Sequence, residues 1–237
     1  MGNSLTSGIS ALALLVFLGK RKGYGIDAIK PHNVTLTLLG AGLLWFGWFG
    51  FNAGSALAAN EIAGLAFITT FIAPAAAGMA WMAAEWYNTG KPTALGFATG
   101  IVAELVGITP AAGFVTPMAA LLIGLIAGIV CYWAVMLKGK LGYDDSLDVF
   151  GVHGAGGITG ALLTGVFASV GATGLLLGNF NQLLLQFEGV VITIIYAGVC
   201  TILIGFVLDR TIGLKVSESE ENIGLDKTCH GETAYNI

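Results

Sequence analysis

The segment DVFGVHGAGGITG, residues 148–160, opens an apolar, glycine-rich stretch that continues to Val170. It contains a histidine, His153, whose nearest charged neighbour in the sequence is Asp148, five positions earlier. An ionisable side chain at the start of a segment of membrane length is costly to bury, so it marks a candidate functional site. The stretch therefore predicts a membrane-spanning helix with a histidine near one end.

The composition of the whole chain is that of an integral membrane protein. Of its 237 residues, 56% are hydrophobic and only 10% are charged, and the mean hydropathy is +0.84. A soluble domain carries about 25% charged residues. The net charge of −4 gives no reason to expect nucleic-acid binding. We find no nucleophile elbow, phosphate-binding loop or metal-ligand spacing, so the sequence predicts no enzyme, no metal site and no cofactor.

Seven apolar runs approach or reach membrane length. They occur at residues 4–19, 34–54, 62–84, 94–109, 114–137, 149–170 and 183–208. A helix needs about 20 residues to span the hydrocarbon, so the first and fourth runs are short. The runs lack the alternation of apolar and polar residues that marks a membrane β-barrel. The sequence predicts an all-α protein with about seven transmembrane helices.

The basic residues predict the orientation. With seven spans, all ten lysines and arginines fall on one side of the membrane: Lys20, Arg21, Lys22, Lys30, Lys91, Lys138, Lys140, Arg210, Lys215 and Lys227. Positive charge favours the cytoplasmic side. We therefore expect the N-terminus outside and the C-terminus inside the cell, in a multi-pass protein of the cell membrane.

Two further patterns concern packing and domain organisation. Glycines stand four residues apart at Gly96 and Gly100, Gly124 and Gly128, and Gly156 and Gly160, which predicts close helix contacts. After a membrane domain at 1–212, residues 213–237 form a polar, acidic tail. This tail is either a disordered end or a docking and regulatory segment on the cytoplasmic face.

The second apolar run places four side chains on one helix face. Leu44, Trp48, Phe51 and Ser55 are spaced i, i+4, i+7 and i+11. Aromatic rings attract a cation, and the hydroxyl of Ser55 accepts a hydrogen bond. The face therefore suits a small cation, or alternatively it is an interfacial aromatic belt combined with ordinary packing.

Three ionisable residues lie within or beside the apolar runs. His153 is either a polar contact between helices or a station for a proton or an amine-like ligand, because a neutral imidazole both donates and accepts. For Asp148 we favour a structural role, in which its side chain either caps the start of the helix or holds the preceding loop in place. Glu104 lies in the middle of the fourth run and receives no assignment.

Taken together, the motifs resemble a known family. They are GKRKGYG (19–25), KPHN (30–33), LWFGWFGFNAGS (44–55), ANEI (59–62), ITPA (108–111), DVFGVHG (148–154) and HGETAY (230–235). The chain resembles the second half of an ammonium transporter of the Amt/Mep/Rh family. The resemblance implies homotrimers of eleven-helix protomers, built from two inverted halves around a narrow hydrophobic pore for ammonium or ammonia.

The resemblance also implies roles for individual residues. Phe51 resembles the second gating phenylalanine, Ser55 the hydroxyl of the outer ammonium site, and His153 the second of the twin pore histidines. Leu44, Trp48 and Val149 match pore-lining positions. The tail resembles the cytoplasmic segment that a PII-type signalling protein senses in this family.

The chain departs from the family at its beginning. The first four helices of the family fold have no counterpart, and Ser4 stands where the first pore histidine is expected. We therefore expect a partial, truncated transporter of ammonium or ammonia. The alternative is a non-conducting regulatory or sensor subunit that associates with full-length ammonium transporters.

Overall fold

The computed structural model describes residues 2–27 and 30–233, and its regular elements over these ranges are all helical. The main helices are α1 (Gly2–Leu18), α2 (Val34–Gly54), α3 (Glu61–Thr89), α4 (Ala94–Ile108), α5 (Pro117–Leu141), α6 (Ala155–Phe167) and α7 (Phe180–Thr211). A π-turn, η1 (Phe150–Gly154), leads into α6, and a short 3₁₀ turn, η2 (Leu175–Leu177), precedes α7. These helices coincide with the seven apolar runs and confirm the all-α prediction.

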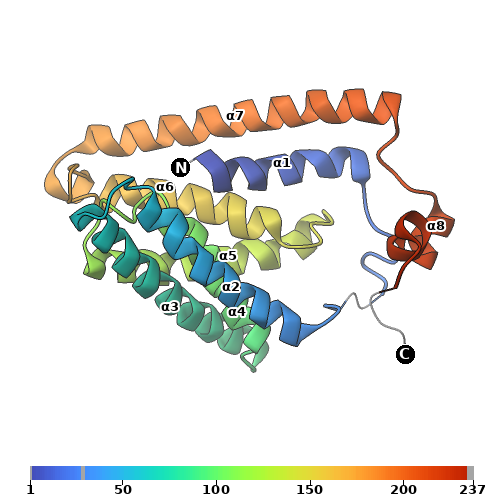
Figure 1. Ribbon diagram of the computed structural model, residues 1–237, viewed down its shortest axis with the longest axis horizontal. Coiled ribbons are helices and arrows are strands. Elements are labelled where there is room, and N and C mark those ends of the chain that lie inside the picture. Colours follow the sequence, from blue (N-terminus) through green and yellow to red (C-terminus); the bar gives the residue numbers. More distant parts are fainter. Residues whose placement is uncertain (1, 28–29, 234–237) are drawn as a thin grey trace.

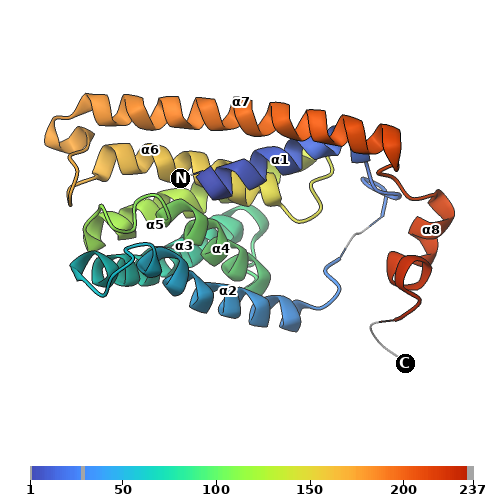
Figure 2. The ribbon, with the colours of Figure 1, turned by 45° about the horizontal axis from the view of Figure 1, so that its top comes forward.

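Helix length separates the seven segments into two groups. Five segments in the described ranges are long and apolar enough to cross a membrane: α2, α3, α5, η1 with α6, and α7. α1 and α4 are shorter apolar helices, as their short runs predict. Figure 1 shows α7 lying beside α1 along one edge of the bundle. Figure 2 shows α2 on the opposite side from α7, with α6 and α3 to α5 between them.

Polar caps set where the helices begin and end. The side-chain oxygen of the residue before α2, α3, α4 and α5 accepts a backbone N–H from the first turn, and these residues are Asn33, Asn60, Thr93 and Thr116. Gly90 ends α3 and Gly142 ends α5 in the left-handed conformation, at φ of 80° and 72°. Such caps satisfy backbone groups that a helix end leaves without partners.

The predicted glycine pairs mark close helix contacts. A Cβ atom on Gly124 would lie 2.3 Å from the carbonyl oxygen of Ala73, and one on Gly128 would lie 2.7 Å from that of Ala77. These contacts seat α5 directly on the backbone of α3. In the same way Gly160 packs α6 against α4, since its Cβ would lie 2.0 Å from the oxygen of Gly107.

A proline in the middle of α3 is compensated by a side chain. Pro74 has no N–H, so it leaves the carbonyl of Thr70 without its helical partner. The indole Nε1 of Trp45 donates to that oxygen at 3.0 Å. The hydrogen bond joins α2 to α3 and satisfies a polar group that the membrane interior would not.

At the end of the bundle where the basic residues gather, polar contacts join segments that are distant in sequence. Arg21 forms a bidentate ion pair with Asp144, at 2.6 and 2.9 Å. The tail contributes α8 (Glu218–Ile223), which begins with a Ser217 capping box, and a further π-turn, η3 (Asp226–His230). Glu221 of α8 accepts the backbone N–H of Lys22 at 2.8 Å. Residues 234–237, the end of the tail motif, lie outside the described residues.

The close contact between α3 and α5 can be tested on one helix. We expect Gly124→Ala to destabilise the protein by about 1–3 kcal/mol, because its new methyl group would overlap the Ala73 carbonyl. Gly139→Ala, also on α5, meets nothing within 4 Å and should keep or raise the melting temperature. Thermal unfolding in detergent measures both variants, and equal melting temperatures would contradict the packing described.

Candidate functional site

The predicted face of α2 forms one wall of a groove. Leu44 and Phe51 remain 51% and 45% exposed. The rings of Trp48 and Phe51 meet edge to face with centroids 5.6 Å apart. The indole Nε1 of Trp48 donates to the hydroxyl of Thr109 at 2.8 Å. This bond anchors the polar edge of Trp48 to the end of α4, rather than leaving it to a lipid headgroup as in an aromatic belt.

The facing wall of this groove comes from α1 and η1. The groove, here called the central groove, has a volume of about 330 Å³ and is lined by Ser4, Ser7, Leu43, Leu44, Gly47, Trp48, Phe51 and His153. The structure thus brings together five of the eight residues predicted for the site. Ser4, at the position where the first pore histidine is expected, lines the same groove as His153.

His153 lies in the π-turn η1, between two cavities. Its Nδ1 atom is buried and has no hydrogen-bond partner among the described residues. Buried polar atoms are nearly always paired, so such an atom requires an explanation. π-Turns inside α-helices frequently occur at functional sites. Because Nδ1 is enclosed, a ligand in the groove meets the other ring nitrogen, Nε2, which in a neutral imidazole either donates or accepts a hydrogen bond.

The start of η1 is set by a carboxylate, although not by the one that the sequence favours. Asp145 accepts the backbone N–H groups of Val149 at 3.0 Å and of Phe150 at 2.7 Å. The carboxylate of Asp148 points elsewhere and pairs with the ammonium group of Lys138. Asp148 also adopts a left-handed backbone, at φ of 56°. The N-cap interpretation of Asp148 is therefore wrong, whereas the loop-tying interpretation agrees with its contact to α5.

The pKa values of two acidic residues in this loop, Asp144 and Asp148, are shifted in opposite directions. Hydrogen bonds from Arg21 hold the pKa of Asp144 below its usual value. Burial raises the pKa of Asp148, and the ion pair with Lys138 offsets part of that effect. The loop before η1 is thus held by two ion pairs, from Asp144 to Arg21 and from Asp148 to Lys138.

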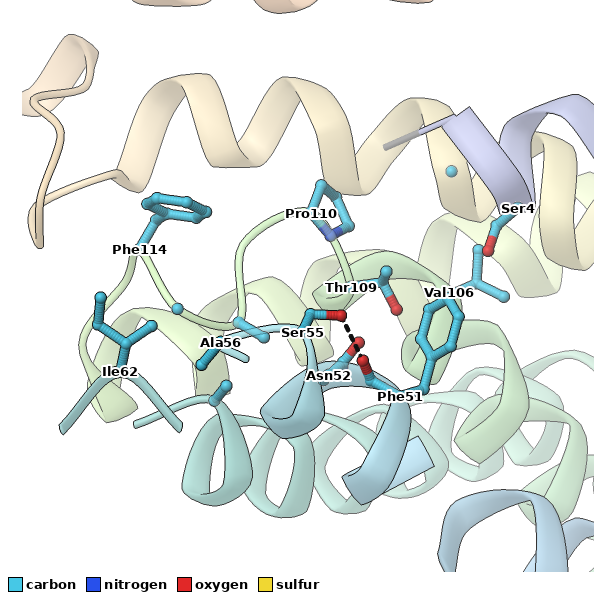
Figure 3. Close-up of a pocket in the computed structure, with 14 residues that line it drawn as sticks. Ser4, Phe51, Asn52, Ser55, Ala56, Ile62, Val106, Thr109, Pro110 and Phe114 are labelled. Atoms are coloured by element: carbon cyan, nitrogen blue, oxygen red, sulfur yellow. Dashed lines mark hydrogen bonds between the residues drawn. The ribbon is translucent and has the colours of Figure 1, made fainter. Parts of the chain in front are cut away.

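A second cavity adjoins the central groove on the side of Ser55. This outer cavity, named for the predicted orientation, has a volume of about 350 Å³. Phe51 and Ser4 line both the outer cavity and the central groove. Figure 3 shows Ser55, Asn52 and Thr109 along one part of its lining, with Phe51 at the boundary. The hydroxyl of Ser55 donates to the carbonyl of Phe51 at 2.6 Å.

A third cavity adjoins the groove at its other end. This inner cavity, of about 280 Å³, is lined by Thr37, Ala41, Ala98, Thr99, Val102, Leu147, Val149, Val152 and His153. His153 is the residue shared with the central groove. The remaining predicted pore residue, Val149, therefore lies beyond His153. The three cavities follow one another from Ser55 past Phe51 and His153 to Val149.

Glu104 lies behind this series of cavities. It is fully buried, and neither carboxylate oxygen has a partner among the described residues. Its Oε2 lies 2.7 Å from where a Cβ of Gly107 would stand, and Glu104 lines none of the three cavities. Nothing in the structure explains a carboxyl group at this position.

Several site residues were missed by the sequence reasoning. Asn52 stands three positions before Ser55 and Thr109 lies within ITPA, so spacing along α2 and the motif itself were available signals. Asp145 has no such signal, because a cap is recognised only once the helix start is known. Lys138 is ten residues from Asp148, and only the turn between α5 and η1 brings them together.

Comparison with known proteins identifies close relatives of this arrangement. A profile described as Ammonium Transporter Family matches residues 4–235. Curated ammonium transporters from Aquifex aeolicus and Bacillus subtilis are 54% and 47% identical over 98% of this chain, which covers 55% and 58% of their lengths. The chain thus spans about half the length of the curated relatives it matches.

Solved structures give the same result for the fold. Saccharomyces cerevisiae Mep2 superposes with a TM-score of 0.85 at 35% identity, covering 92% of this chain and 53% of that one. A structure described as a sensor Amt protein superposes with a TM-score of 0.86 at 33% identity, covering 94% of this chain and 57% of that one.

The role of Asp145 can be tested by graded substitution. We expect Asp145→Ala to lower the free energy of unfolding by about 1–2 kcal/mol, because the capped N–H groups lose their acceptor. Asp145→Asn keeps one oxygen acceptor and should lose less. Thermal unfolding in detergent gives the ranking. A melting temperature for the alanine variant equal to that of the unchanged chain would contradict the capping role.

Proposed function

The chain belongs to the ammonium transporter family, and from this we propose that it forms one wall of a narrow hydrophobic pore for ammonium or ammonia. The observation that supports the proposal is the series of cavities from Ser55 past Phe51 and His153 to Val149. Its middle section is bounded by apolar and aromatic side chains, with an imidazole as the main polar group. Such a passage suits a small molecule that alternates between a charged and a neutral form.

The physical chemistry favours crossing in the neutral form. Removing an ion from water costs several kcal/mol even after the protein relaxes. The central groove offers no carboxylate to compensate for that cost. In our proposal the cation is held at the outer cavity and passes one proton to solvent water there, so that a hydronium ion stays outside and ammonia crosses the groove. The imidazole of His153 offers the neutral molecule a hydrogen-bond partner where the central groove meets the inner cavity.

The exposure of Leu44 and Phe51 indicates that the pore needs a second wall. Half of each side chain remains open to the surroundings. In transporters with inverted repeats the pore lies between two halves of opposite orientation. All ten basic residues are predicted on one side, so a second copy would insert the same way round. We therefore propose that the second wall comes from further polypeptide of the same family fold rather than from a second copy.

Transport by the chain alone and with that second wall can be compared directly. In cells without their own ammonium transporters, we expect radiolabelled methylammonium uptake only when a segment with the first helices of the family fold is co-expressed. Uptake by the chain alone, at the rate of a complete transporter, would contradict the need for a second wall. Absence of uptake in both cases would contradict the transport proposal.

The role of His153 is tested in the same co-expression system. We expect His153→Ala to lower methylammonium uptake at least tenfold or to allow an ionic leak, because the groove loses its only imidazole while keeping its apolar lining. The melting temperature should change little, since Nδ1 has no partner among the described residues. Normal, electrically silent uptake by the variant would refute this role.

A regulatory or sensor function is the second candidate. Two observations favour it: the likeness to a protein described as a sensor Amt protein, and the contact of Glu221 in α8 with the backbone of Lys22. In this alternative the tail, residues 213–237, transmits a signal to a PII-type partner within a mixed trimer that includes full-length transporters. Affinity purification separates the two functions, because recovery of the chain free of any longer homologue would count against a subunit role.

A further inference from the structure

We propose that the side-chain oxygen of Asn52 is a second hydrogen-bond acceptor for the cation at the outer cavity, beside Ser55. The inference rests on the proposed function and assigns a specificity-determining residue to it. Asn52 lies in α2, is only 7% exposed, and lines the outer cavity.

The contact with Thr70 fixes which way the side-chain amide of Asn52 points. The hydroxyl of Thr70 donates its single hydrogen to the carbonyl of Ala66 at 2.6 Å. It can therefore only accept in its contact with Asn52, at 2.9 Å from Nδ2. The amide nitrogen faces Thr70 because a carbonyl oxygen there would meet no donor. The Oδ1 atom consequently points away from α3.

The Oδ1 atom of Asn52 lies at the outer cavity. No donor among the described residues contacts this oxygen, and it is absent from the fully enclosed side-chain atoms that lack a partner. It is therefore an unpaired acceptor that remains accessible on an otherwise buried residue. Burying an amide in this way costs free energy unless a ligand or a water molecule completes its hydrogen bonds.

Asn52 lies beside Ser55, the residue predicted to bind the cation. Ser55 follows three positions later, so the two side chains lie on the same side of α2, and Figure 3 shows them at the same part of the cavity. Because Ser55 uses its hydrogen on the Phe51 carbonyl, its oxygen presents only lone pairs to the cavity. The ring of Phe51 borders the same space.

The chemistry of this arrangement selects the class of ligand. Two oxygen acceptors and an aromatic ring match a small cation with several N–H donors, such as ammonium or methylammonium. An alkali ion of the same charge would need a fuller set of oxygen ligands, and the cavity lining includes no carboxylate. Asn52 would thus favour N–H cations over metal ions.

Binding can be measured without transport. The purified chain in detergent is heated in increasing ammonium chloride, with sodium chloride at equal concentration as the reference. A ligand that binds the folded state raises the melting temperature by mass action. We expect ammonium-specific stabilisation of the unchanged chain. In Asn52→Leu the ammonium concentration needed for the same shift should rise by roughly tenfold or more, since one acceptor to a cation is lost.

Two matched variants separate this role from a structural one. Thr70→Ser keeps the hydroxyl that orients the amide and should bind ammonium as the unchanged chain does. Asn88→Leu removes another amide that donates to a hydroxyl, that of Tyr132, but far from the cavity, and it should also leave binding unchanged. Thr70→Val, which lets the amide rotate, should weaken binding as Asn52→Leu does.

The outcomes distinguish this inference from the proposed function. Equal ammonium stabilisation of the unchanged chain and Asn52→Leu would overturn the role of Asn52, as would the absence of any ammonium-specific shift in the unchanged chain. Ammonium binding that depends on Asn52, together with no uptake in the co-expression system, would support the site while counting against transport. If Asn52→Leu does not fold, Thr70→Val and Thr70→Ser give the decision.

Discussion

The close approach of helix backbones is the constraint on which the rest of the structure depends. In a membrane the lipid tails are as apolar as leucine, so helices associate through packing and polar contacts rather than through the hydrophobic effect. Gly124 and Gly128 let α5 lie against the carbonyl groups of α3, and Gly160 does the same for α6 against α4. These contacts hold the central helices together. The segments that line the groove pack on these helices, since α2 contacts α3 and α4, and η1 contacts α5 and α6.

Polar groups in the apolar interior are paired with few exceptions, and the exceptions are informative. The carbonyl freed by Pro74 is taken by Trp45, and the amide of Asn52 is turned by Thr70. Nδ1 of His153, by contrast, is buried without a partner in the described residues, and the residue lines two cavities. Glu104 also has no partner among the described residues, yet it lines none of the three cavities. Location relative to the groove, rather than burial alone, therefore separates a candidate transport residue from an unexplained one.

The two proposed functions differ in what covers the exposed groove. With its apolar wall covered by a complementary half, the series of cavities becomes a closed passage in which an ion is costly and a neutral amine is not. Left as one wall beside complete transporters, the same helices would still present the tail and its contact at Lys22. The physical difference between the two functions is whether Leu44 and Phe51 face protein or lipid.

The sequence by itself determined the class of fold and most of the α2 face that lines the cavities. Hydropathy and charge predicted the seven helical segments, because a bilayer accepts only helices or closed barrels. Helical spacing predicted that Leu44, Trp48, Phe51 and Ser55 share a face, because that periodicity is local. Only the tertiary structure showed that Ser4 and His153 line the same groove as that face. Likewise, it alone showed that Asp145 caps the π-turn, that Lys138 pairs with Asp148, and that Thr70 orients Asn52. The groove and the contacts of Lys138 and Thr70 depend on segments that only packing brings together, and no local period encodes such contacts. The Asp145 contact is local, but it is recognised only once the start of the π-turn is known.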